Sequence, residues 1–407
     1  MAAEVTGTAV VKVPFSRNYK LLMINAGMSR TGTSGFQLAV LWIALVITNS
    51  PVLAGFADGM AVLPLFLSFV FGAYVDRLAS RKALAVVVSI ARSVSILAIF
   101  LALLINNLLV ETISIYFVAF VIGMTTDILN STRASWSKQF LEMSQYQSGV
   151  SLSQSILAVA EGIGYGVSGL LILKGLQFAV YSFVIIFAVS IVPILMLRNE
   201  RTESIFQEKS MQSSVVEGMK FVLGDSRLRG LVIIILVLNL AFGTIGIFTA
   251  YLVDMKFGLP AIFYTTLALS ITSGILVGSA VGSKAKGKVG FYSIALILPM
   301  GVILYLLGFL DSIFLDFAIL FIGGIFLGVL NVVVNTAVLH IVRQEMMGRV
   351  SGTFNTFGLS LTFLSGAIGG VLIQLISLQW AFVLVGGIIM VASFLPLAFR
   401  DFYNLTV

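Results

Sequence analysis

The sequence contains no cysteine and one histidine, His340, in 407 residues. Without cysteine, the chain can form neither a disulfide framework nor a thiolate metal site. A single histidine argues against a histidine-cluster metal site and against a Ser-His-Asp triad. The chain also has no GxxxxGK[ST] loop, which excludes a nucleotide-driven pump of the P-loop type. We therefore expect no cofactor, no metal and no enzymatic activity.

Charged residues are also scarce. Asp, Glu, Lys and Arg make up 10% of the chain, and 59% of the residues are apolar, with a mean hydropathy of +1.09. Soluble domains carry about 25% charged residues, so this composition excludes a soluble globular protein and a disordered chain. A membrane-spanning helix needs about 20 apolar residues, so twelve need about 240, which this chain can hold with short loops.

Apolar runs between charged breaks predict twelve membrane-spanning helices. They lie at about 21–48, 52–75, 83–105, 112–134, 149–173, 177–197, 230–253, 261–282, 290–310, 317–340, 350–376 and 379–399. The predicted fold is an all-α integral membrane protein with two six-helix pseudo-symmetric bundles, 1–197 and 230–407. The polar stretch 198–229 is the predicted cytoplasmic linker. Within it, Val215, Met219, Val222 and Leu223 fall at helical spacing, which predicts an amphipathic helix on the membrane surface.

The positions of the basic residues predict how the chain is oriented. Of the 24 Lys and Arg, 20 fall in the tails and loops of one side, and only Lys174 and Lys256 fall on the other. Arg30 and Arg92 lie inside spans. Cytoplasmic loops carry the excess of Lys and Arg, so both termini should be cytoplasmic, in the plasma (inner) membrane. Because topology accounts for the net charge of +7, no nucleic-acid partner is needed.

The two predicted bundles repeat each other in sequence. Gly72 and Lys82 recur as Gly278 and Lys288, Gly123 recurs as Gly328, and the pair Gly166 and Gly169 recurs as Gly366 and Gly369, at offsets of 206, 205 and 200. Matches in order at nearly constant offset indicate a duplication. Parallel repeats of six spans are a transporter architecture, in which the substrate site lies between the halves.

One loop resembles that of a known family. The segment after the second span reads Gly72-x-x-x-Asp76-Arg77-x-x-x-Arg81-Lys82, which resembles the signature loop of the major facilitator superfamily. More narrowly, the chain is similar to the drug:proton antiporter branch that includes macrolide-efflux proteins and enterobactin exporters. The residues that carry this narrower resemblance are Arg17–Leu22, Arg92, Glu217-Gly218 and Gly348-Arg349-Val350.

Five ionisable residues are predicted well inside spans, all in the first half: Arg30, Asp58, Arg92, Asp127 and Glu161. Such groups are costly in a membrane and mark functional sites. At about 1.5 Å per residue, Arg30, Arg92 and Asp127 reach a similar depth, so Asp127 is the expected partner of either arginine. Two cations then face three acids, which predicts that one acid takes up a proton. Asp58 and Glu161 are the first candidates, and Asp127 joins them when substrate displaces its arginine. The alternative is a purely structural Arg–carboxylate network.

Polar residues also lie along spans 1, 4, 7 and 10, which the resemblance implies line a central cavity. The candidates for contact with substrate are Arg30, Ser34, Gln37, Asn130, Asn239, Asn331 and Asn335. On span 1, Arg30, Ser34 and Gln37 share one helix face. The alternative interpretation is that such stripes serve tight helix packing.

Two further sets of residues are candidates for conformational roles. The resemblance places Asp76 beside the start of span 11, where a helix N-terminus favours a carboxylate. The signature loop is therefore expected to hold the halves closed on the cytoplasmic side, through Gly72, Asp76, Arg77, Arg81 and Lys82. Small residues allow close helix approach where the halves meet, or else static packing. They are Gly162, Gly166, Gly169, Gly366, Gly369 and Gly370.

Acidic residues near the outer ends of the spans are expected to be solvated loop charges. They are Glu111, Asp254, Asp311 and Asp316.

The leading hypothesis is a secondary active transporter that exports a small amphipathic solute by proton-coupled alternating access. A second hypothesis is proton-symport uptake, with Arg30 holding an anionic solute. An intramembrane enzyme would need a catalytic cluster at one depth, and no residues are spaced for one. The expected partners are a small-molecule substrate, protons and the lipid bilayer, and the resemblance implies a monomer.

Overall fold

The computed structural model describes residues 14–64, 80–142, 145–198, 220–342 and 362–406. Over these ranges the secondary structure is helical, apart from one isolated bridge between Lys288 and Thr406. Ten of the described helical segments are long and apolar enough to cross a membrane, and Pro51–Val62 is a shorter apolar helix. The predicted all-α membrane fold is therefore confirmed, and the described helices are consistent with twelve spans.

The first half contains eight described helices. They are α1 (Arg17–Thr48), α2 (Pro51–Val62), α4 (Arg81–Ser95), α5 (Leu97–Ile105), α6 (Leu108–Phe140), α7 (Tyr146–Leu173), α8 (Leu176–Val189) and α9 (Val192–Leu195). Four of them start at a residue whose side chain accepts a hydrogen bond from the first turn: Ser16, Ser50, Ser80 and Asn107. Two of them end at an asparagine in the left-handed conformation, Asn49 after α1 and Asn106 after α5.

The second half contains the remaining described helices. They are α11 (Ser226–Phe242), α12 (Ile245–Tyr251), the π-helical turn η3 (Leu252–Lys256), α13 (Ala261–Gly282), α14 (Val289–Leu307), α15 (Ile313–Ile341), α17 (Thr362–Ala392), α18 (Leu395–Ala398) and α19 (Arg400–Tyr403). A non-helical residue, Ser377 (φ 69°, ψ 161°), divides α17 into two arms. This residue lies between the predicted spans 350–376 and 379–399. The first arm packs against α2 and the second against α14.

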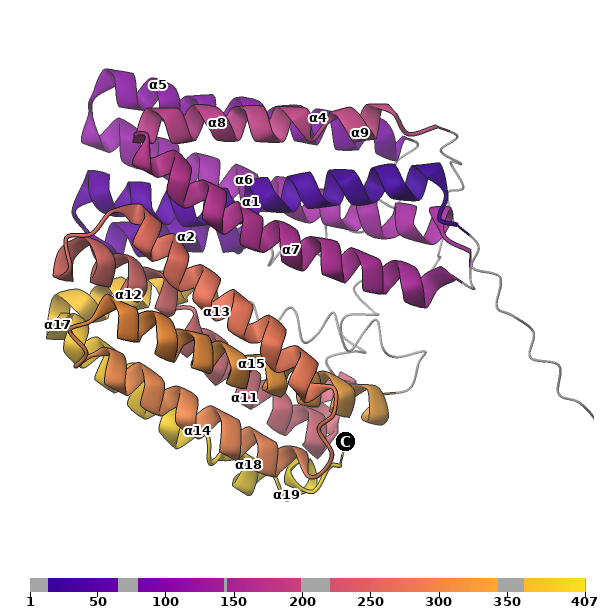
Figure 1. The fold of residues 1–407 in the computed structure, drawn as a ribbon, viewed down its shortest axis with the longest axis vertical. Coiled ribbons are helices and arrows are strands. Elements are labelled where there is room, and N and C mark those ends of the chain that lie inside the picture. Colours follow the sequence, from indigo (N-terminus) through magenta and orange to yellow (C-terminus); the bar gives the residue numbers. More distant parts are fainter. Residues whose placement is uncertain (1–13, 65–79, 143–144, 199–219, 343–361, 407) are drawn as a thin grey trace, which may run out of the picture.

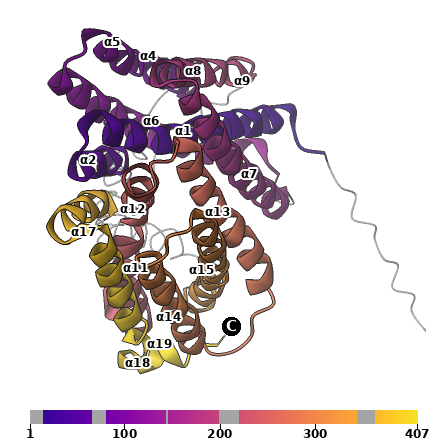
Figure 2. The same ribbon diagram turned by 60° about the vertical axis from the view of Figure 1, so that its left-hand side comes forward.

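The helices form two groups that lie side by side, α1–α9 in one and α11–α19 in the other (Figure 1). The start of α1 and the segment after α18 both lie at the right-hand end of this view, which we call the near end. The opposite end, where α1 leads into α2 and α17 turns at Ser377, is the far end. In both views the helices of each group run roughly between these ends (Figures 1 and 2).

The closest contacts that join the two groups lie toward the far end, along what we call the seam. One side of the seam is formed by α2 and α17, where Gly370 packs against the backbone of Pro51 and Gln374 Nε2 donates to Ser50 Oγ at 3.4 Å. The other side is formed by α7 and α13, where Gly169 packs against Thr265. The protein is therefore closed at its far end.

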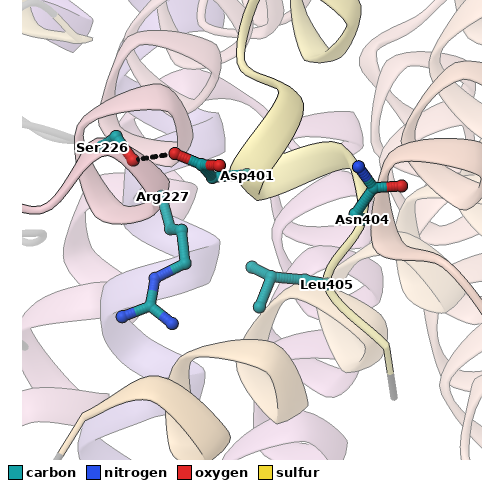
Figure 3. Close-up of a pocket in the computed structure, with 5 residues that line it drawn as sticks. All are labelled: Ser226, Arg227, Asp401, Asn404 and Leu405. Carbon is teal, nitrogen blue, oxygen red and sulfur yellow. Dashed lines mark hydrogen bonds between the residues drawn. The ribbon is translucent and has the colours of Figure 1, made fainter.

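A clasp, residues 400–406, covers the near end of the second half. The backbone amide of Val289 donates to Leu405 O at 2.7 Å, and Lys288 Nζ donates to Asn404 Oδ1 at 3.1 Å. Ser226 Oγ donates to Asp401 Oδ2 at 2.5 Å beside a hollow of about 450 Å³ (Figure 3). These bonds fix the clasp to the first turns of α11 and α14.

Candidate functional site

An ion pair joins α1 and α7 within their membrane-spanning parts. Arg30 Nη2 lies 2.5 Å from Glu161 Oε2, and Tyr165 Oη donates to the other carboxylate oxygen, Glu161 Oε1, at 2.8 Å. The side chain of Arg30 is 40% exposed and that of Glu161 is 26% exposed, so water or a solute can contact the ion pair. We call Arg30, Glu161 and Tyr165 the α1–α7 cluster.

Small residues bring α1 and α7 close enough for this cluster to form. The position of a Cβ on Gly35 lies 2.7 Å from the carbonyl oxygen of Gly164, which leaves no room for a larger side chain. Thr31 Oγ1 donates to Ala160 O at 3.0 Å across the same contact. Ser34 is 3% exposed, and its hydroxyl donates to Arg30 O at 2.8 Å. Ser34 was a candidate for substrate contact, but it is packed between the helices, since its face of α1 meets α7.

A second polar group lies on α1 and α2. Gln37 Nε2 donates to Asp58 Oδ1 at 3.4 Å, and the Gln37 side chain is exposed. Across the seam, Trp42 of α1 stacks on Tyr264 of α13, with ring centroids 5.7 Å apart and planes at 19°. Asp58 and Tyr165 both lie close enough to Tyr264 for a charge on either residue to act on the Tyr264 hydroxyl group. The α1–α7 cluster and Asp58 therefore adjoin the seam.

The second buried arginine, Arg92 on α4, is 1% exposed and binds hydroxyl groups. Its guanidinium donates to Ser29 Oγ at 2.9 Å and to Thr33 Oγ1 and Thr126 Oγ1 at 2.5 Å each. It also lies 4.2 Å from the centroid of the Phe187 ring. Arg92 thus ties α1, α4, α6 and α8 together.

Asp127 was the expected partner of Arg30 or Arg92. Asp127 lies on α6 and is 7% exposed, but Arg30 pairs with Glu161, and Thr126, the residue before Asp127, binds Arg92. The similar depth of Arg30, Arg92 and Asp127 agrees with these contacts, but the partner of Arg30 depends on how α1 is rotated about its axis.

Arg133 was one of the 20 basic residues counted in the tails and loops, although it lies at the end of the predicted span 112–134. The helix α6 continues to Phe140, so Arg133 lies inside it. Arg133 Nε donates to Asn25 Oδ1 at 3.0 Å, and its Nη1 donates to Asn130 Oδ1 at 3.2 Å. Asn130, a predicted substrate contact, is therefore held by an arginine that the sequence analysis missed.

The other predicted cavity residues differ in exposure. Asn331 and Asn335 on α15 are exposed, and Asn239 on α11 is half-buried. Of the residues missed from sequence, Tyr165 carried a usable signal, because it lies four residues after Glu161 and so on the same face of a helix.

The predicted interface glycines differ in what packs against them, and they form three sets. Gly169, Gly366 and Gly370 pack against the opposite half at the seam, on Thr265, Gly55 and Pro51. Ideal Cβ atoms on Gly162 and Gly166 would each lie 3.8 Å from the Leu269 side chain of α13, so these positions are looser. Gly369 packs inside the second half, against Ile247 and Thr244.

The predicted gate is only partly described. Gly72, Asp76 and Arg77 lie outside the described residues. Arg81 and Lys82 begin α4, and Lys82 Nζ donates to Leu195 O and Leu197 O at 2.8 Å each. Lys82 therefore binds carbonyl groups at the end of α9, within its own half.

Two of the acids expected to be solvated are buried. Asp316 is 0% exposed and Glu111 is 8% exposed, and each lies in the first turn of its helix and not in the loop before it. Asp311 is solvated as expected, with a side chain that is 85% exposed, and it pairs with Lys256 Nζ at 3.0 Å.

An apolar groove lies directly behind the α1–α7 cluster. It has a volume of about 640 Å³ and is formed by α1, α7 and α8. Thr31 and Ala160, which contribute to its wall, are the chain neighbours of Arg30 and Glu161. Its size is within the usual range of small-molecule sites, about 300–1,000 Å³.

The chain is similar to known proteins over nearly its whole length. A family model described as the Major Facilitator Superfamily matches residues 22–366. The uncharacterized MFS-type transporter YkuC of Bacillus subtilis (strain 168) is 23% identical over 371 residues, 85% of this chain and 84% of that protein. Among solved structures, the nucleoside transporter NupG matches with a TM-score of 0.74 at 12% identity, over 96% of this chain and 100% of that chain. A D-xylose-proton symporter matches with a TM-score of 0.66 at 11% identity, over 93% and 96%.

Proposed function

The chain belongs to the major facilitator superfamily, and from this premise we propose that it exports a small amphipathic solute in exchange for protons. Membership makes it a multi-pass membrane transporter of small molecules and not an enzyme. The proposal adds the direction, the coupling ion and the kind of solute, as in the drug:proton antiporter branch that its motifs resemble.

The observation that carries the proposal is the α1–α7 cluster. A proton on Glu161 would neutralise the carboxylate and weaken its bond to Arg30, since the charge on both partners strengthens that bond. The helix α7 also forms the seam with α13 through Gly169 and Thr265. Protonation of Glu161 would thus change the contacts of a helix on which far-end closure depends.

These contacts suggest an order of events for export. With the far end closed and Glu161 paired to Arg30, the ionised cluster is ready to accept solute from the near end. When the far end opens, a proton reaches Glu161 and the solute leaves. Asp58, bonded to Gln37 at the seam, and Asp127 on α6 are the further candidates for carrying the proton.

The surroundings of the cluster support an amphipathic solute. Carboxylates, Gln37 and exposed asparagines can bind polar groups, and the apolar groove behind Arg30 and Glu161 can take an apolar part. Pockets that combine an apolar lining with a few placed polar groups are typical of small-molecule sites.

We also propose that the protein works as a monomer in the plasma (inner) membrane, with the near end and both termini in the cytoplasm. The distribution of Lys and Arg, 20 against two, supports this orientation. The three-part organisation into 1–197, 198–229 and 230–407 belongs to the same proposal, and most of the linker lies outside the described residues.

The test is flux of a substrate panel in proteoliposomes with an imposed pH gradient. The variants are Glu161→Gln, Asp58→Asn and Asp127→Asn, with Asp311→Asn as a matched control on an exposed acid. We expect Glu161→Gln to lose gradient dependence and the control to keep it. If all three variants keep the gradient dependence of the unmodified protein, proton coupling through these residues is wrong.

The same assay distinguishes uptake by symport. That function needs Arg30 to bind an anionic solute, but its guanidinium is engaged by Glu161 in this structure. Accumulation of an anionic solute down an inward proton gradient would support symport and contradict the proposal of export.

A further inference from the structure

Asp316 is a buried acid in the second half of the protein, far along the chain from the α1–α7 cluster. It lies in the first turn of α15 at the far end and is 0% exposed. Neither of its carboxylate oxygens has a hydrogen-bond partner among the described residues. A buried carboxylate without donors is unusual, because buried polar groups are nearly always hydrogen-bonded.

Among the described residues, the cation near Asp316 is Lys256, which is engaged by other groups. Lys256 Nζ, at the end of η3, pairs with Asp311 Oδ1 at 3.0 Å and donates to Leu310 O at 2.7 Å. Lys256 and Asp311 are the charged groups within electrostatic reach of Asp316. The helices α13 and α14, which pack on α15, carry no charged residue, and their titratable residues are Tyr264, Tyr292 and Tyr305.

The geometry favours the neutral form of this acid. Removing a carboxylate from water is costly unless donors or a cation compensate. In the described part of the chain no donor reaches this carboxylate, and Lys256 is bound elsewhere. The N-terminal end of α15 and the field of Lys256 act in the opposite direction, but neither supplies a hydrogen bond to the carboxylate. A proton on Asp316 removes the charge.

We propose that Asp316 is a second protonation site, in the half of the protein opposite Glu161, and that it holds a proton while the far end is closed. When the far end opens, water reaches the side chain, the proton leaves to that far-side water, from which it is taken up again on closure, and the Lys256 ammonium moves from Asp311 to the carboxylate of Asp316. Asp316 therefore carries no proton across the membrane and does not oppose the movement through Glu161. The π-helical turn η3, which carries Lys256, is the element that would move, since such turns are often functional.

This inference deepens the proposed function, on which its role in transport rests, but the bound proton can be measured without transport. A protonated carboxyl group has its own C=O stretching band in the infrared spectrum. The experiment records this band in the purified protein in lipid nanodiscs across a pH titration. The variants are Asp316→Asn, which removes the acid, and Asp311→Asn, which removes the exposed partner of Lys256.

We expect a protonated-carboxyl band that persists above the pH at which solvated carboxyl groups ionise and that is absent in Asp316→Asn. In Asp311→Asn the band should be lost at a lower pH, because Lys256 is then free to pair with Asp316. Identical spectra for the unmodified protein and Asp316→Asn would show that Asp316 is ionised and would overturn the inference. The isosteric change is chosen to keep the packing of α15.

Lys256→Met provides a second measurement that leaves Asp316 in place. Without this cation, the band should persist to more alkaline pH than in the unmodified protein. An unchanged titration would contradict the proposed interaction between Lys256 and Asp316, and with it the inference.

The proposals of proton-coupled export and of a protonated Asp316 can be contradicted independently. If flux does not depend on the pH gradient while the Asp316 band is present, proton coupling is wrong and the protonation site stands. If flux needs the gradient and Glu161 while the band is absent, coupling stands and the second site is wrong.

Discussion

Gly55 of α2 and Gly366 of α17 lie backbone to backbone at the seam. A Cβ placed on Gly366 would lie 2.7 Å from the carbonyl oxygen of Gly55, and a Cβ on Gly55 would meet the carbonyl of Gly366 even more closely. Real side chains do not approach backbone atoms so closely, so closure of the far end depends on glycine at both positions.

Gly366→Ala should therefore separate α2 from α17 and favour the state open at the far end. Overpacking of this kind costs about 1–3 kcal/mol. We expect a lower thermal midpoint, slower transport and higher reactivity of a cysteine placed at Ser50. Gly387→Ala is the control, because nothing lies within 4 Å of a Cβ at that position of the same helix. Equal effects of the two changes would contradict the role of Gly366 in closure.

Thr126→Val should destabilise the first half by about 1–3 kcal/mol, because a buried guanidinium loses one acceptor. Thr126 Oγ1 accepts from Arg92 Nη2 at 2.5 Å. The matched control on the same helix is Thr112→Val, since the Thr112 hydroxyl binds only its own helix, at Leu108 O. Thermal unfolding of both variants in the same lipid or detergent measures the difference, and a Thr112→Val midpoint as low as that of Thr126→Val would count against the role of Arg92.

Asp225 caps the start of α11, and its contribution should depend on pH. Its carboxylate accepts from the backbone amide of Arg227 at 2.9 Å and binds the Arg227 guanidinium at 2.7 Å. The side-chain hydrogen bond from Arg227 lowers the pKa of Asp225 below its usual 3.8. Stability from this acid is therefore present above the usual pKa and is lost as the pH falls through the lowered pKa.

At neutral pH, Asp225→Ala should cost about 1 kcal/mol, the usual cost of removing an N-cap. Asp225→Asn should cost less, because asparagine also caps helices but cannot form the ion pair. The measurement is the thermal midpoint of each variant at neutral and acidic pH. If the thermal midpoints of Asp225→Ala and the unmodified protein differ as much in strong acid as at neutral pH, Asp225 does not act as a helix cap in the way described.

Cysteine labelling tests the proposed orientation in a chain that has no native cysteine. A cysteine at Ser312, before α15 at the far end, should react with an impermeant maleimide added outside intact cells. A cysteine at Ser283, after α13 at the near end, should react only once the membrane is permeabilised. Labelling of both from the same side would contradict the model of two opposite ends with cytoplasmic termini.

Hydropathy predicted the helices well, because long apolar segments have no alternative to helix inside a membrane. The signature loop and the scarcity of charge were enough to predict the superfamily fold. The predicted fourth span ends at residue 134, whereas α6 continues to Phe140. The span was ended there because charged residues were taken to mark loops. Arg133, however, is bonded to Asn25 and lies inside the helix.

The partners of the buried charges could not be predicted, because they depend on how each helix is rotated about its axis. Arg30 and Asp127 reach a similar depth, yet Arg30 faces α7, where Gly35 and Gly164 allow contact, and so it pairs with Glu161. Burial of Asp316 was missed for a related reason: the position of a residue at the start of a helix does not show what packs over it.

The clasp at residues 400–406 is made after the helices that it covers. Gly230 of α11 and Gly290 of α14 enter the membrane early in synthesis, but the side chains that fill the space over them, Phe399 and Tyr403, emerge from the ribosome much later. The packing of α11 and α14 is therefore complete only once Phe399 and Tyr403 are in place. A chain arrested before Phe399 would lack the side chains that pack on Gly230 and Gly290.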